Sequence, residues 1–117
     1  MQNEIYSIEA EQYVLAAILI NPEIYEEVAE ILSADDFYSE QNKIIYASIS
    51  KIYSKTKSLD LLMLLNDIVS RSQRDDETAR NSTKEYLMQL SENVPVITNV
   101  KEYANIIKEK SLQRKYI

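Results

Sequence analysis

The sequence predicts an all-α fold, a compact bundle of about six helices around a buried first helix. Two observations predict it. Residues 9–20, EAEQYVLAAILI, are apolar on nearly every side of a helix, which is typical of a helix buried in a core. The later segments are each apolar on one side only, as expected of helices that pack around a central one.

The second helix is predicted to start at Pro22, where the missing N–H costs no hydrogen bond, and to run to Leu32. Its apolar stripe comprises Ile24, Val28 and Ile31, and its acidic stripe comprises Glu23, Glu26, Glu27 and Glu30. Carboxylate metal sites in helix bundles also use the histidine of Glu-x-x-His, and the chain has no histidine. We therefore interpret the acidic stripe as a solvated face, or as a docking surface for a basic partner.

Residues 33–36 are predicted to form a turn or a short helical start. We interpret the aromatic pair Phe37-Tyr38 as an anchor to the core rather than as a platform that stacks a ligand. Ser39 is predicted to cap a third helix that ends near Tyr53. The inward residues of this helix are predicted to be Ile45, Ser48 or Ile49, and Ile52.

The fourth helix is predicted to follow a polar connector at residues 54–58, with Asp60 as its cap. Its inward residues are predicted to be Leu61, Leu64, Leu65 and Ile68. The very polar residues 74–81 are predicted to be a loop. Ser82 and Glu85 match a capping box, which predicts a fifth helix carrying Tyr86, Leu87 and Leu90. Val94-Pro95 should end this helix, because proline disfavours a helical conformation in the preceding residue.

The last helix is predicted to start at Asn99, which forms a cap pattern with Glu102, and to run to the end of the chain. Five residues share a stripe that can pack on the body, namely Val100, Tyr103, Ala104, Ile107 and Ser111. Four apolar residues fall outside this stripe, namely Ile106, Leu112, Tyr116 and Ile117. Apolar side chains left on the outer side of a helix indicate a partner helix, so we predict a self-association interface there.

The residue types that are missing exclude several kinds of chemistry. The chain has no cysteine, no histidine and no glycine. It therefore lacks disulfides, the usual zinc ligands and histidine acid–base catalysis. It also lacks the glycine-rich loops that hold nucleotide phosphates, including the Walker A motif. We predict no catalytic, metal-binding or cofactor-binding residue in this chain.

Charge is unevenly distributed along the chain. Residues 1–98 hold 8 basic and 17 acidic residues, whereas residues 99–117 hold 5 and 2. An acidic body repels the phosphates of DNA, so we expect little DNA binding by this chain alone. The basic residues of the last helix form either a solvated face or a weak nucleic-acid stripe: Lys101, Lys108, Lys110, Arg114 and Lys115. With no basic leader segment and no apolar run near the ~20 residues that span a bilayer, we expect a cytoplasmic protein without membrane contact.

An ordered set of residues resembles a known family over nearly the whole chain. It begins with Glu9-Ala10-Glu11-Gln12, continues with Asn21-Pro22-Glu23 and Asp36-Phe37-Tyr38, and closes with Tyr103-Ala104 and Lys108-Glu109-Lys110. This order resembles the N-terminal domain of the bacterial replicative DNA helicase, DnaB. Two positions depart from the family pattern: Asn42 stands where most members carry a histidine, and Asn81-Ser82 replaces a Gly-Gly turn.

The resemblance implies a role in DNA replication. It divides the chain into a globular helical body, residues 1–98, and the first helix of a helical hairpin, residues 99–117. In this family, hairpins of neighbouring subunits pair, and the resulting dimers form a collar on a hexameric ring that receives primase. The resemblance further implies that ATP and Mg²⁺ bind in a motor domain outside these 117 residues, with which the full-length helicase unwinds DNA in the bacterial replisome.

Two alternative functions remain open at this point. The helicase-binding C-terminal domain of primase has a related helical fold in its family and is also an interaction module. An enzyme would need paired acids in a cleft, for which the candidates are Asp35 with Asp36, and residues 75–77. Adjacent carboxylates on turns more often cap helices or face water, so we expect an interaction module without an active site.

Overall fold

The computed structural model of the protein describes residues 4–74, 76–92 and 98–116. In these ranges the chain forms six α-helices and one short 3₁₀ helix, and no strand, so the all-α prediction is confirmed. The elements are α1 (Ile8–Ile20), α2 (Ile24–Ala29), η1 (Ala34–Asp36), α3 (Glu40–Thr56), α4 (Leu61–Ser72), α5 (Glu77–Glu92) and α6 (Val100–Lys115).

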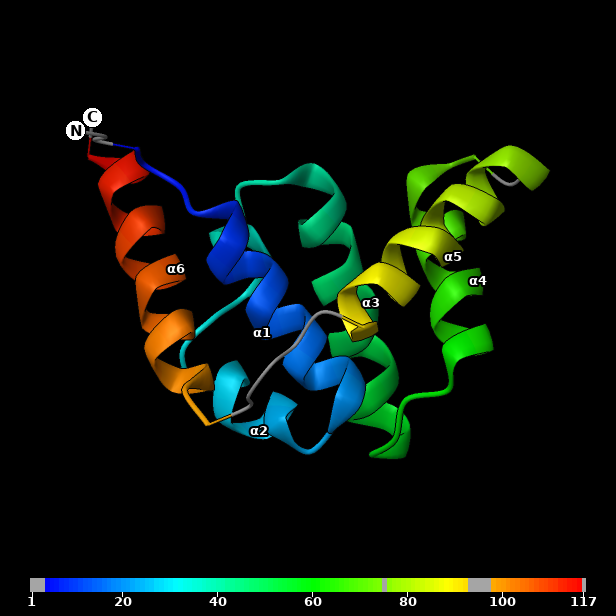
Figure 1. Cartoon of the computed structure of the whole chain (residues 1–117), viewed down its shortest axis with the longest axis horizontal. Coiled ribbons are helices and arrows are strands. Elements are labelled where there is room, and N and C mark those ends of the chain that lie inside the picture. Colours follow the sequence, from blue (N-terminus) through cyan, green and yellow to red (C-terminus); the bar gives the residue numbers. More distant parts are fainter. Residues whose placement is uncertain (1–3, 75, 93–97, 117) are drawn as a thin grey trace.

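The first helix, α1, is the centre of the molecule. It lies between α6 on one side and α3 and α5 on the other, while α4 packs on α3 and α5 farther out (Figure 1). Its buried residues lie on all sides of the helix: Ala10, Glu11, Val14, Leu15, Ala16, Ala17 and Ile18. The predicted buried first helix is therefore confirmed.

Side-chain caps fix where several helices begin. Ser39 Oγ accepts a hydrogen bond from the Asn42 amide at 3.2 Å, and Asp60 Oδ1 accepts one from the Leu62 amide at 2.8 Å. The predicted caps of α3 and α4 are thus confirmed, although α3 continues three residues past the predicted end, to Thr56. The predicted short helical start at residues 33–36 is η1, which is closed by a capping box.

The second helix, α2, is shorter than predicted. It spans Ile24–Ala29, and Pro22 lies in the turn before it rather than at its first position. The Tyr25 amide donates to the Pro22 carbonyl at 3.0 Å, so a tight three-residue turn leads into the helix. The predicted inward residues Ile24 and Val28 are buried nonetheless.

The predicted start of the fifth helix is wrong. Helix α5 begins at Glu77, so the second half of the predicted loop is helical and Ser82 lies inside the helix. Asp76 is the residue that starts it, since its Oδ1 accepts a hydrogen bond from the Ala79 amide at 2.8 Å. Leu87 and Leu90 are buried as predicted, whereas the predicted break at Val94-Pro95 lies outside the described residues.

The first turn of α4 differs from the prediction as well. Leu61 was predicted to face inward, but 51% of it is exposed, together with 63% of Leu62 and 49% of Met63. Since all three residues of this turn are exposed, the turn projects beyond the core. Successive helical residues point about 100° apart, so these side chains do not form one apolar face. Leu64 and Ile68 are buried as predicted.

The last helix, α6, packs against α1, α2 and η1. The predicted inward residues Val100, Ala104, Ile107 and Ser111 are buried, and the half-buried Tyr103 stacks on Tyr13 with ring centroids 4.1 Å apart. Asn99 holds the predicted cap position but makes no side-chain capping bond. The helix starts beside the predicted boundary at residue 98, and the hairpin beyond it stays a prediction. No helix in the described ranges is long and apolar enough to cross a bilayer.

Candidate functional site

The outer side of α6 carries the predicted self-association residues. Ile106 is 37% exposed, Leu112 is 41% exposed and Tyr116 is 84% exposed, while Ile117 lies outside the described residues. Leu112 and Tyr116 are four residues apart, so they are neighbours on one side of the helix. Ile106 lies about 120° around the helix axis from Leu112. The candidate interface is therefore centred on Leu112 and Tyr116, with Ile106 on a different side.

The basic residues of α6 are not gathered into one stripe. Lys101, Lys108 and Lys115 follow one line at seven-residue spacing, whereas Arg114 lies about 120° and Lys110 about 160° around the axis from Lys108. Lys110 Nζ donates to the Glu4 carbonyl at 2.7 Å, and Arg114 Nη1 donates to the Ile5 carbonyl at 2.8 Å. These two side chains hold the N-terminal segment on α6, which leaves Lys101 and Lys115 as exposed cations.

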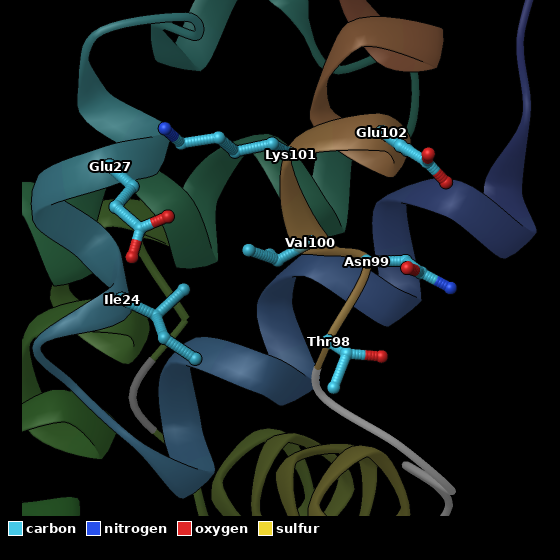
Figure 2. A pocket seen from close by; sticks show the side chains of 7 residues that line it. All are labelled: Ile24, Glu27, Thr98, Asn99, Val100, Lys101 and Glu102. Atoms are coloured by element: carbon cyan, nitrogen blue, oxygen red, sulfur yellow. The ribbon is translucent and has the colours of Figure 1, made fainter.

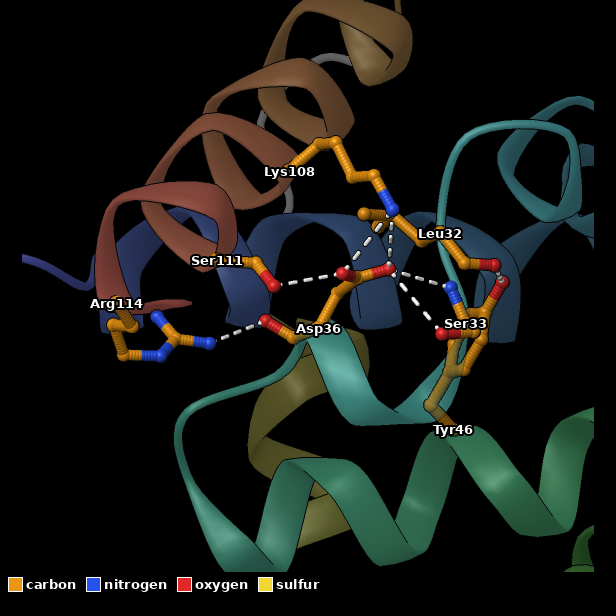
Figure 3. Close-up of polar contacts among 7 residues, drawn as sticks. All are labelled: Leu32, Ser33, Asp36, Tyr46, Lys108, Ser111 and Arg114. Atoms are coloured by element: carbon orange, nitrogen blue, oxygen red, sulfur yellow. Dashed lines mark hydrogen bonds and ion pairs between the residues drawn. The ribbon is translucent and has the colours of Figure 1, made fainter. Parts of the chain in front are cut away.

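The inner side of α6 is anchored by Asp36 of η1, which is only 2% exposed (Figure 3). Asp36 Oδ1 accepts a hydrogen bond from Ser111 Oγ at 2.7 Å and lies 3.3 Å from Lys108 Nζ. Its Oδ2 accepts one from the Ser33 amide at 2.8 Å. Its backbone carbonyl accepts one from Arg114 Nη2 at 2.7 Å. One buried residue thus contacts three side chains of α6.

The charge of Asp36 is stabilised where it lies. Burial by itself would raise the pKa of this carboxyl. Hydrogen bonds from Ser33, Ser111 and Lys108, together with the positive charge of Lys108, outweigh burial and hold the pKa below its ordinary value. Asp36 is therefore a carboxylate at neutral pH, and Lys108 balances its charge.

A second buried carboxylate holds the chain just after Asp36. Glu11 of α1 is 1% exposed and accepts hydrogen bonds from the Tyr38 amide at 2.7 Å and from Asn42 Nδ2 at 2.9 Å. Asn42 Oδ1 in turn accepts a hydrogen bond from Tyr86 of α5 at 2.6 Å. Asn42 therefore joins α1, α3 and α5 as both donor and acceptor.

The aromatic pair after η1 has two different environments. Phe37 is 1% exposed and packs on Tyr46, so it anchors the core as predicted. Tyr38 is 49% exposed, which corrects the prediction that it also anchors the core. Its ring stacks on Tyr6 at 4.1 Å, and the Arg114 guanidinium lies 5.5 Å from its centroid. Tyr38 thus covers the junction between α6 and the N-terminal segment.

A pocket of about 310 Å³ lies where α6 begins beside α2 (Figure 2). It is lined by Ile24, Glu27, Thr98, Asn99, Val100, Lys101 and Glu102. Two carboxylates against one lysine give it a negative charge, which disfavours a phosphate ligand. Among the described residues, no group of three or more acidic side chains is arranged to hold a metal ion.

Of the acidic residues that an enzyme would need, Asp36 and Asp76 make hydrogen bonds that hold helices in place. Asp36 is buried and bonded, whereas its neighbour Asp35 is exposed, so they do not share a cleft. Asp76 caps α5, and residue 75 lies outside the described residues. Sequence analysis missed the anchoring role of Asp36 because its α6 partners are more than 70 residues away. The one signal was Ser111, a polar residue within the predicted inward stripe.

Comparison with known proteins agrees with this architecture. Residues 3–109 match the family model described as "DnaB-like helicase N terminal domain". The crystal structure of the N-terminal domain of DnaB helicase from Mycobacterium tuberculosis superposes with a TM-score of 0.80 at 28% identity. This match covers 94% of the present chain and 76% of that chain.

Curated relatives give the same result. The Replicative DNA helicase DnaB of Pasteurella multocida is 31% identical over 112 residues, and that of Haemophilus influenzae is 33% identical over 112 residues. Each match covers 96% of this chain but 23% of the relative, so the chain spans about a quarter of the length of these helicases. The family model covers most of the described helices, from α1 into α6. The chain therefore belongs to the DnaB-like helicase N-terminal domain family.

Proposed function

We propose that this chain is a collar domain of a replicative DNA helicase, which joins helicase subunits and receives primase. The observation that carries the proposal is the pair Leu112 and Tyr116, which is exposed away from the buried residues of α6, Val100, Ala104, Ile107 and Ser111. Covering such an apolar pair with a second helix is favourable, because it removes apolar surface from water. In a symmetric dimer, the same face of a second copy provides that cover.

The proposed mechanism is geometric and involves no chemical step in this chain. Contacts between collar domains raise the effective concentration of the attached motor domains, and a ring of domains presents several primase sites at once. ATP-driven unwinding of duplex DNA at the replication fork is proposed for the full-length protein, with ATP and Mg²⁺ bound outside this chain. The proposed place of action is the cytoplasmic replisome of a bacterium.

DNA is proposed to contact the assembled full-length hexamer rather than this domain. The chain carries a net charge of −6, and two of the five basic residues of α6 bind backbone carbonyls of the N-terminal segment. Such a surface attracts little phosphate backbone. The alternative function, the helicase-binding domain of primase, is not favoured, because the family model and the relatives above are helicases.

Sedimentation velocity at rising concentration tests the proposed self-association. The parent chain is expected to form dimers that the Leu112→Asp variant does not form, because a charge would have to be buried in the interface. Gln113→Asp is the matched control, since Gln113 is the next residue, is exposed and receives the same charge. A parent chain that stays monomeric at millimolar concentration, or a Leu112→Asp dimer as strong as the parent's, would contradict the proposal.

A further inference from the structure

We propose that Asp36 is a positioning residue for α6, which fixes the rotation of the second half of this helix on the body. The side of the helix on which Leu112 and Tyr116 lie would follow from that rotation. The rotation itself is argued from contacts within the chain. Its consequence for self-association rests on the proposed function.

The three α6 residues that contact Asp36 are spaced so as to prevent the helix from rolling. Lys108, Ser111 and Arg114 are three residues apart, so each points about 60° around the axis from the one before. Ser111 lies at the middle of the inward side, with Lys108 at one edge and Arg114 at the other. A roll in one direction would break the contact with Lys108, and a roll in the other direction would break the contact with Arg114.

Apolar packing does not fix this half of the helix. The first half is held in the core by Val100, Ala104 and Ile107, all buried. From residue 108 to residue 115, Ser111 is the one buried residue, and its contact is the hydrogen bond to Asp36. Hydrogen bonds depend on direction, whereas apolar burial does not, so the polar contacts define the angle of this half.

The residues on both sides of this contact, Asp36 of η1 and Arg114 of α6, are themselves held by other residues. The carboxylate is held in place by the Ser33 amide, and the segment that follows is held by Glu11 of α1. Arg114 bonds the Asp36 carbonyl and the Ile5 carbonyl and lies against Tyr38. The anchor therefore connects α6 to η1 and to the N-terminal segment, and a change at residue 36 is transmitted directly to residues 108–115.

Amide hydrogen exchange of the dilute chain tests the positioning role. Asp36→Asn keeps the side-chain shape but removes the charge that Lys108 and Ser111 contact, so exchange in residues 108–115 is expected to rise roughly tenfold or more. Exchange in residues 100–107 is expected to stay within about twofold of the parent. Asp35→Asn is the matched control, because Asp35 is the exposed neighbour, and it is expected to leave both halves unchanged.

A second variant removes a contact of Asp36 by a change on α6. Asp36 also caps η1, so Ser111→Ala removes one contact of the anchor while leaving that capping box intact. It is expected to raise exchange in residues 108–115 in the same pattern, and Gln113→Ala is expected not to. If both Asp36→Asn and Ser111→Ala leave the exchange of residues 108–115 as in the parent, or raise it equally along the whole chain, the positioning role is wrong.

The hydrogen-exchange test of Asp36 can succeed or fail independently of the dimerisation test of the proposed function. Exchange is measured on the dilute chain, so the anchor is tested even if the chain never dimerises. If the chain does dimerise, Asp36→Asn is expected to weaken the dimer at least several-fold, whereas Asp35→Asn does not. A dimer that is unaffected by Asp36→Asn despite faster exchange would support the anchor but overturn its link to self-association.

Discussion

Two buried carboxylates, Glu11 and Asp36, make hydrogen bonds that join separate helices of this domain. A buried carboxylate is stable only when other interactions replace its lost water; Glu11 is held by hydrogen bonds, and Asp36 by hydrogen bonds and the charge of Lys108. Their partners lie between 27 and 78 residues away in the sequence, apart from Ser33 beside Asp36. Sequence patterns report on near neighbours, so neither role could be predicted from the sequence.

The lowered pKa of Asp36 predicts how stability depends on pH. The unfolded chain binds this proton near the ordinary pKa of 3.8, whereas the folded chain binds it at lower pH. The stabilisation is therefore complete well above pH 3.8 and is lost as pH falls through the folded pKa. Urea midpoints measured from pH 7 to pH 3 should fall less steeply in Asp36→Asn than in the parent. A residual slope is expected from Asp67 and Asp76, whose pKa values are also lowered, and identical slopes would contradict the prediction.

Substitution of Asn42 tests the second polar contact. Asn42→Leu would leave Glu11 and the Tyr86 hydroxyl without their shared partner, at a cost of about 2–4 kcal/mol in the free energy of unfolding. Neutral histidine can also donate with one ring nitrogen and accept with the other, so Asn42→His is expected to cost clearly less at pH 8. Urea unfolding of the three chains provides the comparison. Equal losses in both variants would show that donor and acceptor roles do not matter there.

At the scale of helices, local signals predicted most elements and failed where two signals competed. Ser39 and Asp60 are single strong caps, and the helices that follow them start as predicted. Residues 74–82 contain two possible caps, Asp76 and Ser82, and the capping-box pattern at Ser82 predicted the wrong helix start. A contact with α4 favours the start at Asp76. Arg80 Nη1 donates to Asn66 Oδ1 at 2.9 Å and holds the first turn of α5 on α4.

The two caps give opposite mutational predictions. Asp76→Ala removes the bond to the Ala79 amide and should lower both helix content and the unfolding midpoint. Ser82→Ala should leave the midpoint unchanged or raise it, because Ser82 lies within the helix and alanine is the better helix former. Circular dichroism during thermal unfolding measures both quantities. A larger loss of helix content and midpoint in Ser82→Ala than in Asp76→Ala would indicate that α5 begins at Ser82 instead.

At the scale of the whole molecule, one buried helix organises the fold. The sequence predicted this architecture because α1 has apolar residues on nearly all its sides. It also predicted which face of α6 packs inward. The candidate interface was predicted as four residues outside the inward stripe, and helical geometry separates Ile106 from Leu112 and Tyr116. The proposed rotation of α6 depends on residue 36. The side-chain contacts of α6 could not be predicted from the sequence, because their partners are distant along the chain.

The central position of α1 predicts a steep contrast between two of its residues. Leu15 is fully buried, so Leu15→Ala should cost about 2–5 kcal/mol in the free energy of unfolding. Ile20 lies at the end of the same helix and is 45% exposed, so Ile20→Ala should cost well under half as much. Chemical denaturation of both variants measures the difference. Similar losses would mean that α1 is not buried as described.

Disulfide trapping tests the central claim, that the outer face of α6 joins two copies of this domain. The chain has no cysteine, so a single introduced thiol reports on its own surroundings. Leu112→Cys and Tyr116→Cys probe the interface. Met88→Cys is the control, because Met88 of α5 is 46% exposed and Leu112 is 41% exposed. Under mild oxidation at equal concentration, at least one α6 variant should form covalent dimers much faster than the Met88→Cys control. Equal, slow rates for all three would contradict the claim.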